Sequence, residues 1–332
     1  MTLRHLMLSM IALFFITGTI SAAKPAKKEK SFFSLFQKES PVYLYSYYTG
    51  NGEDGLHLMY SHDGIVWRAL NNGKSLLKPT VGPTKTMRDP SIAQDAQGTF
   101  HMVWTTGSEN SIGYASSKDL INWSEQVLLP VMSNEPTVKN TLAPELIYDN
   151  ISKSFDIVWA STIPGRFTEN GKTEEESNNR LYTTTTTDFK SLSKTKLFYN
   201  PNFPVSDACF LKKGGSYYMF LKNDTENPLE KNIRYISSGR LKSFSKEVSE
   251  PISGKKLAEG PTAVQIGKYT YVYWNNYMDK SLGGARCNNL KKAQWENISD
   301  IIRFPAGAKQ GTAFKAEDKI LINLQKLGKV TE

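Results

Sequence analysis

The chain has 332 residues, which is enough for two average domains or for one large all-β domain. Hydrophobic residues make up 39% of it and charged residues 22%, which excludes a disordered acidic chain and a fibrous repeat. The formal net charge is +9, but six basic and two acidic residues precede residue 41, so the remainder carries +5 and has no basic stripe. We therefore expect no nucleic-acid partner.

The N-terminal segment has the features of a secretory signal peptide. The apolar run from Leu6 to Ile20 follows Arg4 and precedes three small residues, and it is shorter than the roughly 20 residues of a membrane span. We expect a signal peptide over residues 1–23, a flexible linker over 24–40 and a single domain over 41–328. The protein would then be exported, periplasmic or extracellular, with no integral membrane segment after removal of the signal.

A strand followed by a polar turn recurs five times after this segment, first as LHLMYSHDGIVW from Leu56 and next as IGYASSKDLINW from Ile112. The copies are 56, 69, 52 and 49 residues apart, counted between Asp63, Asp119, Asp188, Arg240 and Asn289. These steps match the length of a four-stranded propeller blade. The polar stretch from Thr162 to Arg180 accounts for the long step as an inserted, solvated loop.

A second pattern precedes the aromatic strands, as RDPSI, APELI, SDACF, EGPTAV and finally QGTAF. The chain therefore begins in the middle of one repeat and ends on the first strand of a repeat, and the two pieces complete one blade. We predict an all-β fold, a five-bladed β-propeller whose ring is closed by pairing the C-terminal strand with the N-terminal blade. No long amphipathic helical pattern competes with this prediction.

The cysteines and histidines indicate neither a disulfide nor a transition-metal site. Cys209 and Cys287 lie in different repeats, and we expect two small buried hydrophobic residues, although an exported protein could form a disulfide. The four histidines show no His-x-x-x-His spacing, and there is no Cys-x-x-Cys motif.

Carboxyl groups recur in the second pattern. The inner strands of a propeller run in the same direction around one axis, so these residues should converge on one mouth of the central channel. The residues concerned are Asp89, Glu145, Asp207, Glu259 and, as an amide, Gln310. Carboxylates that lie close together repel one another and cost stability, which is typical of acid–base sites. The alternative is that they are unrelated turn or capping residues.

Taken together, the motifs resemble glycoside hydrolase family 43, the five-bladed furanosidases and xylosidases, and in particular its exported bacterial members. The resemblance covers about residues 41–328 and is carried, in order, by RDPSI, APELIYD, SDACFLKKGGSYYMF, LAEGPTAV and FPAGAKQGTAF. It implies inverting hydrolysis of a plant-type polysaccharide or oligosaccharide by an α-L-arabinofuranosidase, arabinanase or β-xylosidase. It further implies Asp89 as the base, Glu259 as the acid and Asp207 as the residue that tunes the acid.

Simple chemistry gives these roles a reason. An inverting site needs a base and an acid roughly 6.5–9.5 Å apart, which inner strands of different blades can supply. An anionic Asp207 would favour the protonated form of Glu259. Arg88 should point to the opposite face of its strand from Asp89, where it forms a structural ion pair or contacts substrate. Carbohydrate is the expected partner of a monomeric enzyme that requires no cofactor, and an ion in the channel is not indicated.

A binding shell is expected around these groups. Glu145 would hydrogen-bond a sugar hydroxyl or support the site. Four aromatic residues near the ends of the second strands would either stack on sugar rings or fill the core between blades, namely Tyr47, Trp104, Trp159 and Trp274. Gln310 stands where many family members have a histidine that organises the channel, and Leu142 where many have a tryptophan.

Three other functions were weighed against this one. A sialidase would need an arginine cluster, which the matching blade positions lack, and a retaining fructosidase would need an Asn-Asp-Pro-Asn string near the first strand, which is also missing. A carbohydrate-binding propeller without turnover stays open because Gln310 replaces the histidine. The intact Asp89, Asp207 and Glu259 favour the enzyme.

Overall fold

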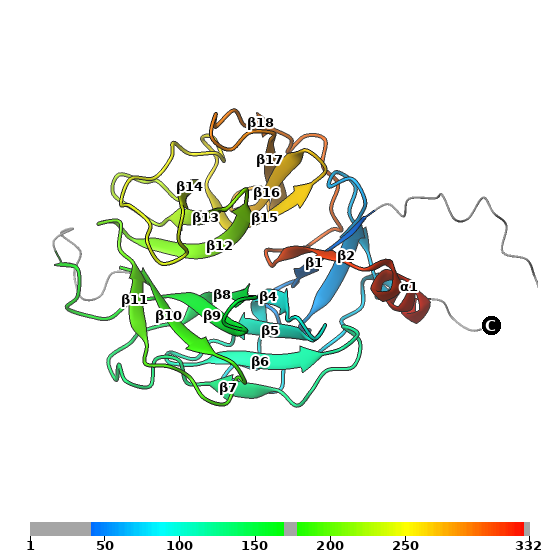
Figure 1. Ribbon diagram of the computed structural model, residues 1–332, viewed down its shortest axis with the longest axis horizontal. Helices are drawn as coiled ribbons and strands as arrows, with labels where there is room; N and C mark the ends of the chain where they lie inside the picture. The colour runs from blue at the N-terminus through cyan, green and yellow to red at the C-terminus, as the bar shows by residue number, and fades with distance from the viewer. Residues whose placement is uncertain (1–40, 169–177, 329–332) are drawn as a thin grey trace, which may run out of the picture. The chain divides into compact units, whose positions relative to one another are not determined.

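The runs of aromatic and β-branched residues form five antiparallel sheets in the computed structural model, which describes residues 41–168 and 178–328 (Figure 1). The chain divides between Glu39 and Ser40, and every described residue belongs to the second unit. The predicted signal peptide and linker lie outside the described residues and stay predictions. Within the described ranges, no helix is both long enough and apolar enough to cross a membrane.

Each sheet is one blade, and its strands follow one another in the chain except in the first blade. The first blade contains β19 (Ala313–Ala316), β1 (Val42–Tyr47), β2 (His57–Ser61) and β3 (Arg68–Ala69). The second contains β4 (Arg88–Gln94), β5 (Phe100–Thr105), β6 (Ile112–Ser117) and β7 (Val127–Leu129). The third contains β8 (Leu142–Asp149), β9 (Ser154–Ser161), β10 (Arg180–Thr186) and β11 (Lys196–Tyr199).

The last two blades follow the same order. The fourth contains only β12 (Val205–Lys213), β13 (Ser216–Asn223) and β14 (Asn232–Ser238). The fifth contains β15 (Ala258–Ile266), β16 (Tyr269–Asn276), β17 (Ser281–Cys287) and β18 (Glu296–Asn297). A short 3₁₀ turn, η2 (Asn71–Gly73), follows the first blade.

The innermost strands surround a central channel. Along the ring β4 contacts β8, β8 contacts β12, β12 contacts β15 and β15 contacts β19, while β1 of the first blade contacts β4. The buried apolar side chains gather in five clusters, each lying between two neighbouring blades. The predicted five-bladed propeller is confirmed, and the packing between blades holds the inner strands in register around the channel.

The ring closes as predicted, through the two ends of the domain. The C-terminal β19 pairs antiparallel with β1, with Ala313 opposite Tyr45 and Ala316 opposite Val42, and lies beside it in Figure 1. The Ser46 N–H donates to the Thr312 carbonyl over 3.0 Å and extends this pairing toward the channel. The first blade therefore contains strands from both ends of the described chain.

One element was not predicted, the helix α1 (Asp318–Leu327) that follows β19. The chain does not end on a strand, because Ile320, Leu321 and Leu324 pack on the apolar cluster between the first two blades. The side chain of Asn72 donates to the Gly328 carbonyl over 2.9 Å and holds the end of the helix on η2. A helix this short has too few turns to show a convincing period in the sequence.

The segment from Thr162 to Arg180 differs in part from the expected solvated loop. Residues 169–177 lie outside the described ranges. Thr162 and Ile163 at one end and residues 178–180 at the other are buried, whereas Gly165, Arg166 and Thr168 are exposed. The Thr162 hydroxyl donates to Asn179 Oδ1 over 2.7 Å, and Arg180 begins β10 with no exposed surface. These ends belong to the third blade, because polar side chains satisfy each other inside it.

The two cysteines are free and buried, as the sequence predicted. Cys209 and Cys287 both belong to the apolar cluster between the fourth and fifth blades, where they pack as small hydrophobic side chains.

Candidate active site

The recurrent motif forms a β-bulge in four of the inner strands. In β4 the pairing register shifts between Arg88 and Ser91, and β8, β12 and β15 shift at the same point of the motif. The backbone has a positive φ in each bulge, at Asp89 (51°), Ala143 (43°), Asp207 (50°) and Gly260 (58°). A bulge breaks the alternation of side chains and redirects them, so these four residues turn toward the channel mouth.

The bulges show that the predicted channel residues do not hold equivalent places. Asp89 and Asp207 lie in the bulge, Glu259 precedes it, and Glu145 follows it. Gln310 lies three residues before Ala313, and Glu259 lies three residues before Thr262, so the two side chains hold matching places before their strands resume regular pairing. The expectation of one ring of five groups is corrected to three levels along the channel, because each bulge adds a residue that an unbroken strand would not have.

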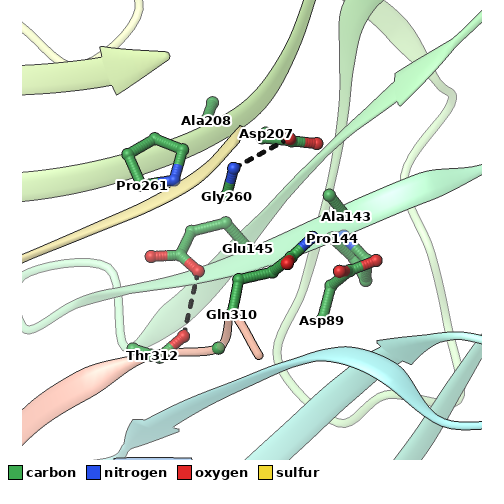
Figure 2. A pocket seen from close by; sticks show the side chains of 11 residues that line it. Asp89, Ala143, Pro144, Glu145, Asp207, Ala208, Gly260, Pro261, Gln310 and Thr312 are labelled. Atoms are coloured by element: carbon green, nitrogen blue, oxygen red, sulfur yellow. Dashed lines mark hydrogen bonds between the residues drawn. The ribbon is translucent and has the colours of Figure 1, made fainter. Parts of the chain in front are cut away.

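A small cavity opens at this mouth (Figure 2). It has a volume of about 30 Å³, which is room for one or two water molecules but not for a sugar ring. Four inner strands and the segment that leads into β19 contribute to its lining, which consists of Asp89, Ala143, Pro144, Glu145, Asp207, Ala208, Gly260, Pro261, Gln310, Gly311 and Thr312. The structure thus brings together four of the five predicted channel groups, with Glu259 next to the lining residue Gly260.

Asp89 is half-buried and held by hydrogen bonds. The Thr105 hydroxyl donates to Asp89 Oδ2 over 2.8 Å and accepts the Ala143 N–H over 2.8 Å. Burial raises the pKa of Asp89, and the Glu259 carboxylate raises it further. The Arg88 guanidinium and the hydrogen bonds from Thr105 and Gln310 lower the pKa of Asp89. The charge of Arg88 therefore favours the ionised form of Asp89, a contribution that the alternation of faces did not predict.

Asp207 is the carboxyl group with the most strongly altered environment of the three candidates. Burial raises the pKa of Asp207 to about 7 against the attraction of Lys222, and the carboxylates of Glu259 and Asp89 add to the rise. The Gly260 N–H donates to Asp207 Oδ2 over 3.0 Å, which ties this side chain to the strand of Glu259. A proton therefore resides in this cluster near neutral pH.

Glu259 contacts two side chains of neighbouring strands. Its Oε2 lies 3.3 Å from Lys222 Nζ, and its Oε1 accepts a 3.3 Å hydrogen bond from the Asn275 amide. The buried Tyr48 lies near all three carboxyl groups. Burial raises the pKa of its hydroxyl group, and the charges of Asp89, Glu259 and Asp207 raise that pKa further. The three predicted catalytic residues are thus close enough to influence a common neighbour.

Glu145 belongs to a different level of the channel. Figure 2 shows its side chain turned away from Asp89 and toward Thr312. Its Oε2 accepts hydrogen bonds from Ser91 over 2.6 Å and from Thr312 over 3.3 Å, and burial raises the pKa of Glu145 to about 7. These contacts link three inner strands, which favours the supporting role over a sugar contact.

The four aromatic residues fill the core and do not line the cavity. Trp104, Trp159 and Trp274 are at most 1% exposed, and Tyr47 is stacked on His57. A Cβ on Gly113 would lie 2.0 Å from the Trp104 ring, so the indole covers the glycine paired with it. The sugar-stacking interpretation is corrected, because these side chains face the neighbouring blade.

Three residues of the site were missed, namely Thr105, Lys222 and Asn275. Each pairs across the blade with the residue that precedes a bulge: Thr105 with Arg88, Lys222 with Ser206 and Asn275 with Glu259. Thr105 and Asn275 directly follow a buried tryptophan. Because side chains alternate along a strand, the polar residue after the core aromatic was the available signal.

The described residues contain neither a metal centre nor a second carboxylate cluster of this kind. No three His, Cys, Asp or Glu side chains among them are grouped so as to hold a metal ion. A larger hollow of about 1000 Å³ lies near β7, but its single described carboxylate, Glu135, is ion-paired with Arg166 over 2.8 Å. The chemistry is therefore concentrated at the channel mouth.

The chain is similar to several known proteins. An α-L-arabinofuranosidase of Bifidobacterium longum subsp. longum is 23% identical over 185 residues, which are 49% of this chain and 17% of that protein. The arabinanase of Cellvibrio cellulosa, solved with arabinohexaose, has a TM-score of 0.55 at 14% identity and covers 81% of this chain and 95% of its own. The α-L-arabinofuranosidase of Lactobacillus brevis has a TM-score of 0.50 at 14% identity, covering 64% and 72%. At these identities the two structures establish the fold alone.

A family profile described as "Probable glycosyl hydrolase domain" and related to glycoside hydrolase family 43 matches residues 39–318. The match includes all five blades and every residue of the carboxylate cluster. The resemblance inferred from the motifs is confirmed, and the chain belongs to this family of glycosyl hydrolases, the relatives of family 43.

Proposed function

We propose that the protein is an exported, monomeric glycoside hydrolase that inverts the anomeric centre and acts on arabinose- or xylose-containing plant-type polysaccharides or oligosaccharides. The observation that carries the proposal is the gathering of Asp89, Asp207 and Glu259 on three inner strands at one mouth of the channel. The names of the Bifidobacterium and Cellvibrio proteins support an arabinose-containing substrate.

In this mechanism Asp89 accepts a proton from a water molecule as the water oxygen attacks the anomeric carbon. The hydrogen bond from Thr105 and the charge of Arg88 favour the ionised form of Asp89 that this step requires. The glycosidic C–O bond breaks, and Glu259 gives its proton to the leaving oxygen. Asp207, whose pKa is raised to about 7, is an anion above that pH, and its charge then favours the protonated form of its neighbour Glu259.

The size of the cavity supports this division of space. Its 30 Å³ accommodate the attacking water beside Asp89, whereas a sugar ring has to bind outside it. Gln310 keeps an uncharged amide beside Asp89, so the base has no titrating imidazole next to it.

The test compares Glu259→Gln, Asp89→Asn and Asp207→Asn with the wild type on an arabinofuranoside and a xyloside, each with an aryl and an alkyl leaving group. Glu259→Gln should lower kcat about 10²- to 10⁴-fold on alkyl leaving groups and little on activated aryl ones, which depart without a proton. Asp89→Asn should suppress all substrates equally. Asp207→Asn should move the alkaline limb of kcat/KM to lower pH, because a neighbouring anion no longer favours protonated Glu259.

Proton NMR of the first product shows the configuration directly. A product of inverted configuration is expected, and a retained configuration would overturn the mechanism. Near wild-type turnover of Asp89→Asn on a natural oligosaccharide would do the same. N-terminal sequencing of the secreted protein tests export, since a mature chain that still begins at Met1 would contradict removal of residues 1–23.

A carbohydrate-binding propeller without turnover is the second candidate. The contact between Lys222 and Glu259 favours it, because an ion-paired carboxylate is a poor proton donor. Calorimetric binding of arabino- or xylo-oligosaccharides by the wild type, without release of sugar over long incubation, would support this candidate against the enzyme.

A further inference from the structure

A buried lysine lies between the proposed proton donor and a second acid. The side chain of Lys222 is 8% exposed, and its Nζ lies 3.0 Å from Asp224 Oδ1 and 3.3 Å from Glu259 Oε2. The ammonium group also lies 5.1 Å from the centre of the Tyr277 ring. Burying a charged amine is costly unless anions surround it, so this position needs more than strand propensity to explain it.

The fold directs Lys222 toward the catalytic cluster. Lys222 is paired with Ser206, immediately before the bulge at Asp207, and follows the buried Leu221 on β13. Burial acts to lower the pKa of Lys222, but the charges of Asp207, Asp224 and Glu259 raise it above its usual range. Lys222 is therefore a cation throughout the pH range in which the carboxyl groups titrate.

We propose that Lys222 is a positioning residue that controls proton donation by Glu259, with Asp224 as its second partner, an inference that rests on the proposed function. When Glu259 gives its proton to the leaving oxygen, the new carboxylate is stabilised by the ammonium group already beside it. While Glu259 is protonated, Asp224 keeps Lys222 paired, so the buried cation is never left without an anion. After product release, Asp89 gives the proton that it took from water to solvent, Glu259 takes a proton from solvent, and the cycle restarts.

The charges that face Glu259 determine the sign of the effect. The charged groups are Asp89 on β4, Asp207 on β12, Lys222 on β13 and Asp224, which directly follows β13. The uncharged polar groups are Asn275, Tyr48 and Tyr277. Among the described residues, Lys222 is the cation within ion-pair distance of Glu259. Removing it leaves carboxylates that all favour the protonated form of Glu259.

The first experiment measures kcat/KM against pH for Lys222→Met, Lys222→Arg and the control Lys213→Met. Lys213 lies at the far end of β12 and donates to Thr270 Oγ1 over 3.1 Å, away from the carboxylates. Lys222→Met should move the alkaline limb up by about one pH unit, since an opposite charge at this distance shifts a carboxyl group by about 1–3 units. It should also lower kcat about 10- to 100-fold on alkyl leaving groups, at or below the lower end of the roughly 10²- to 10⁴-fold range for removal of an acid–base group, with KM within about twofold.

Lys222→Arg keeps the positive charge and should return the alkaline limb of kcat/KM to its wild-type pH. Lys213→Met should leave both the pH profile of kcat/KM and the rates unchanged. An alkaline limb that stays in place in Lys222→Met, or moves equally in Lys213→Met, would overturn the inference.

A second measurement is independent of turnover. Carbon-13 NMR of protein labelled at the glutamate carboxyl carbons identifies the Glu259 signal by its loss in Glu259→Gln. The titration midpoint of this signal should rise by about one unit in Lys222→Met and fall in Asp224→Asn, which leaves Lys222 to Glu259 alone. The two substitutions are expected to shift the titration midpoint of Glu259 in opposite directions. Either variant alone therefore tests the role of Lys222 if the other does not fold.

The two measurements separate the inference from the proposed function. An inactive wild type with shifted midpoints would reject the enzyme but keep the ion-pair control of Glu259. If the wild type is active but neither substitution changes the titration midpoint of Glu259, the proposed enzyme function stands and Lys222 is rejected as a positioning residue.

Discussion

Two carboxyl groups of the channel, Asp207 and Glu145, have their pKa raised to about 7, in both cases chiefly by burial. Asp207 lies beside other carboxylates and Lys222, whereas Glu145 accepts hydrogen bonds from the hydroxyl groups of Ser91 and Thr312. The same ionisable group therefore lies among charged side chains at one level of the channel and joins strands at another. The partners, and not the size of the shift, distinguish the two roles.

Glu145 makes stability depend on pH. Its pKa is 4.5 when unperturbed and about 7 in the folded protein, so its contribution is fully present below about pH 4.5 and is lost as the pH rises to about 7. Glu145→Gln keeps the shape and an accepting oxygen but cannot ionise. Urea denaturation should show the variant gaining on the order of 3 kcal/mol relative to wild type between pH 4 and pH 8.

The exposed Glu125→Gln is the matched control and should show no such change. If the difference between Glu145→Gln and wild type were the same at both pH values, the burial of this carboxyl group would be refuted.

At the scale of the strand, the bulge is the element that builds the site. It holds Asp89, Ala143 and Asp207 in left-handed backbone conformations, which cost roughly 1–2 kcal/mol for each residue with a Cβ. Gly260 avoids this cost, and a Cβ there would lie 2.4 Å from Gln310 Cβ. At Asp89 and Asp207 the strained backbone carries a carboxyl group of the candidate site. At Ala143 the strained backbone carries only a methyl group.

Ala143→Gly should therefore stabilise the protein. Relief of about 1–2 kcal/mol of strain exceeds the greater flexibility of glycine in the unfolded chain, about 0.5–1 kcal/mol, so a net gain of about 0.5–1 kcal/mol is expected. The N–H that donates to Thr105 remains. The same change at the buried Ala115 on β6, which has no positive φ, should destabilise by about 1 kcal/mol. Equal losses at both sites would contradict strain in the bulge.

At the scale of the ring, the first blade joins its neighbours through hydrogen bonds near the channel. The Ser46 hydroxyl donates to the Pro90 carbonyl over 2.6 Å, and the Ala313 N–H donates to Thr262 Oγ1 over 2.9 Å. These bonds tie the blade made from both chain ends to β4 on one side and to β15 on the other. The helix α1 then covers the apolar cluster between the first two blades.

The apolar face of α1 should contribute measurably to the stability of the closed ring. Leu324 is fully buried in that cluster, so Leu324→Ala should destabilise by about 2–5 kcal/mol through lost burial and a cavity. Ile322 on the same helix is 53% exposed, and Ile322→Ala should change stability by less than about 0.5 kcal/mol. Urea midpoints at constant slope give both values, and equal effects would mean that α1 does not dock as described.

The sequence alone determined the five blades, the closure through β19 and the candidates Asp89, Asp207 and Glu259. The reason is physical: strands and turns are local, so their repetition is visible along the chain. Three strands of a blade at one end and one strand at the other leave one way to complete the ring. The motifs also placed the three carboxyl groups on inner strands, because each motif directly precedes a run with strand character.

Only the tertiary structure decided which side chains face the mouth. The bulges place Asp89 at the channel mouth and Glu145 on another level of the channel. Trp104 is core while Thr105 reaches Asp89, a difference of one residue that depends on the pairing register. Such contacts join strands of different blades, and a local pattern holds no information on how those blades meet.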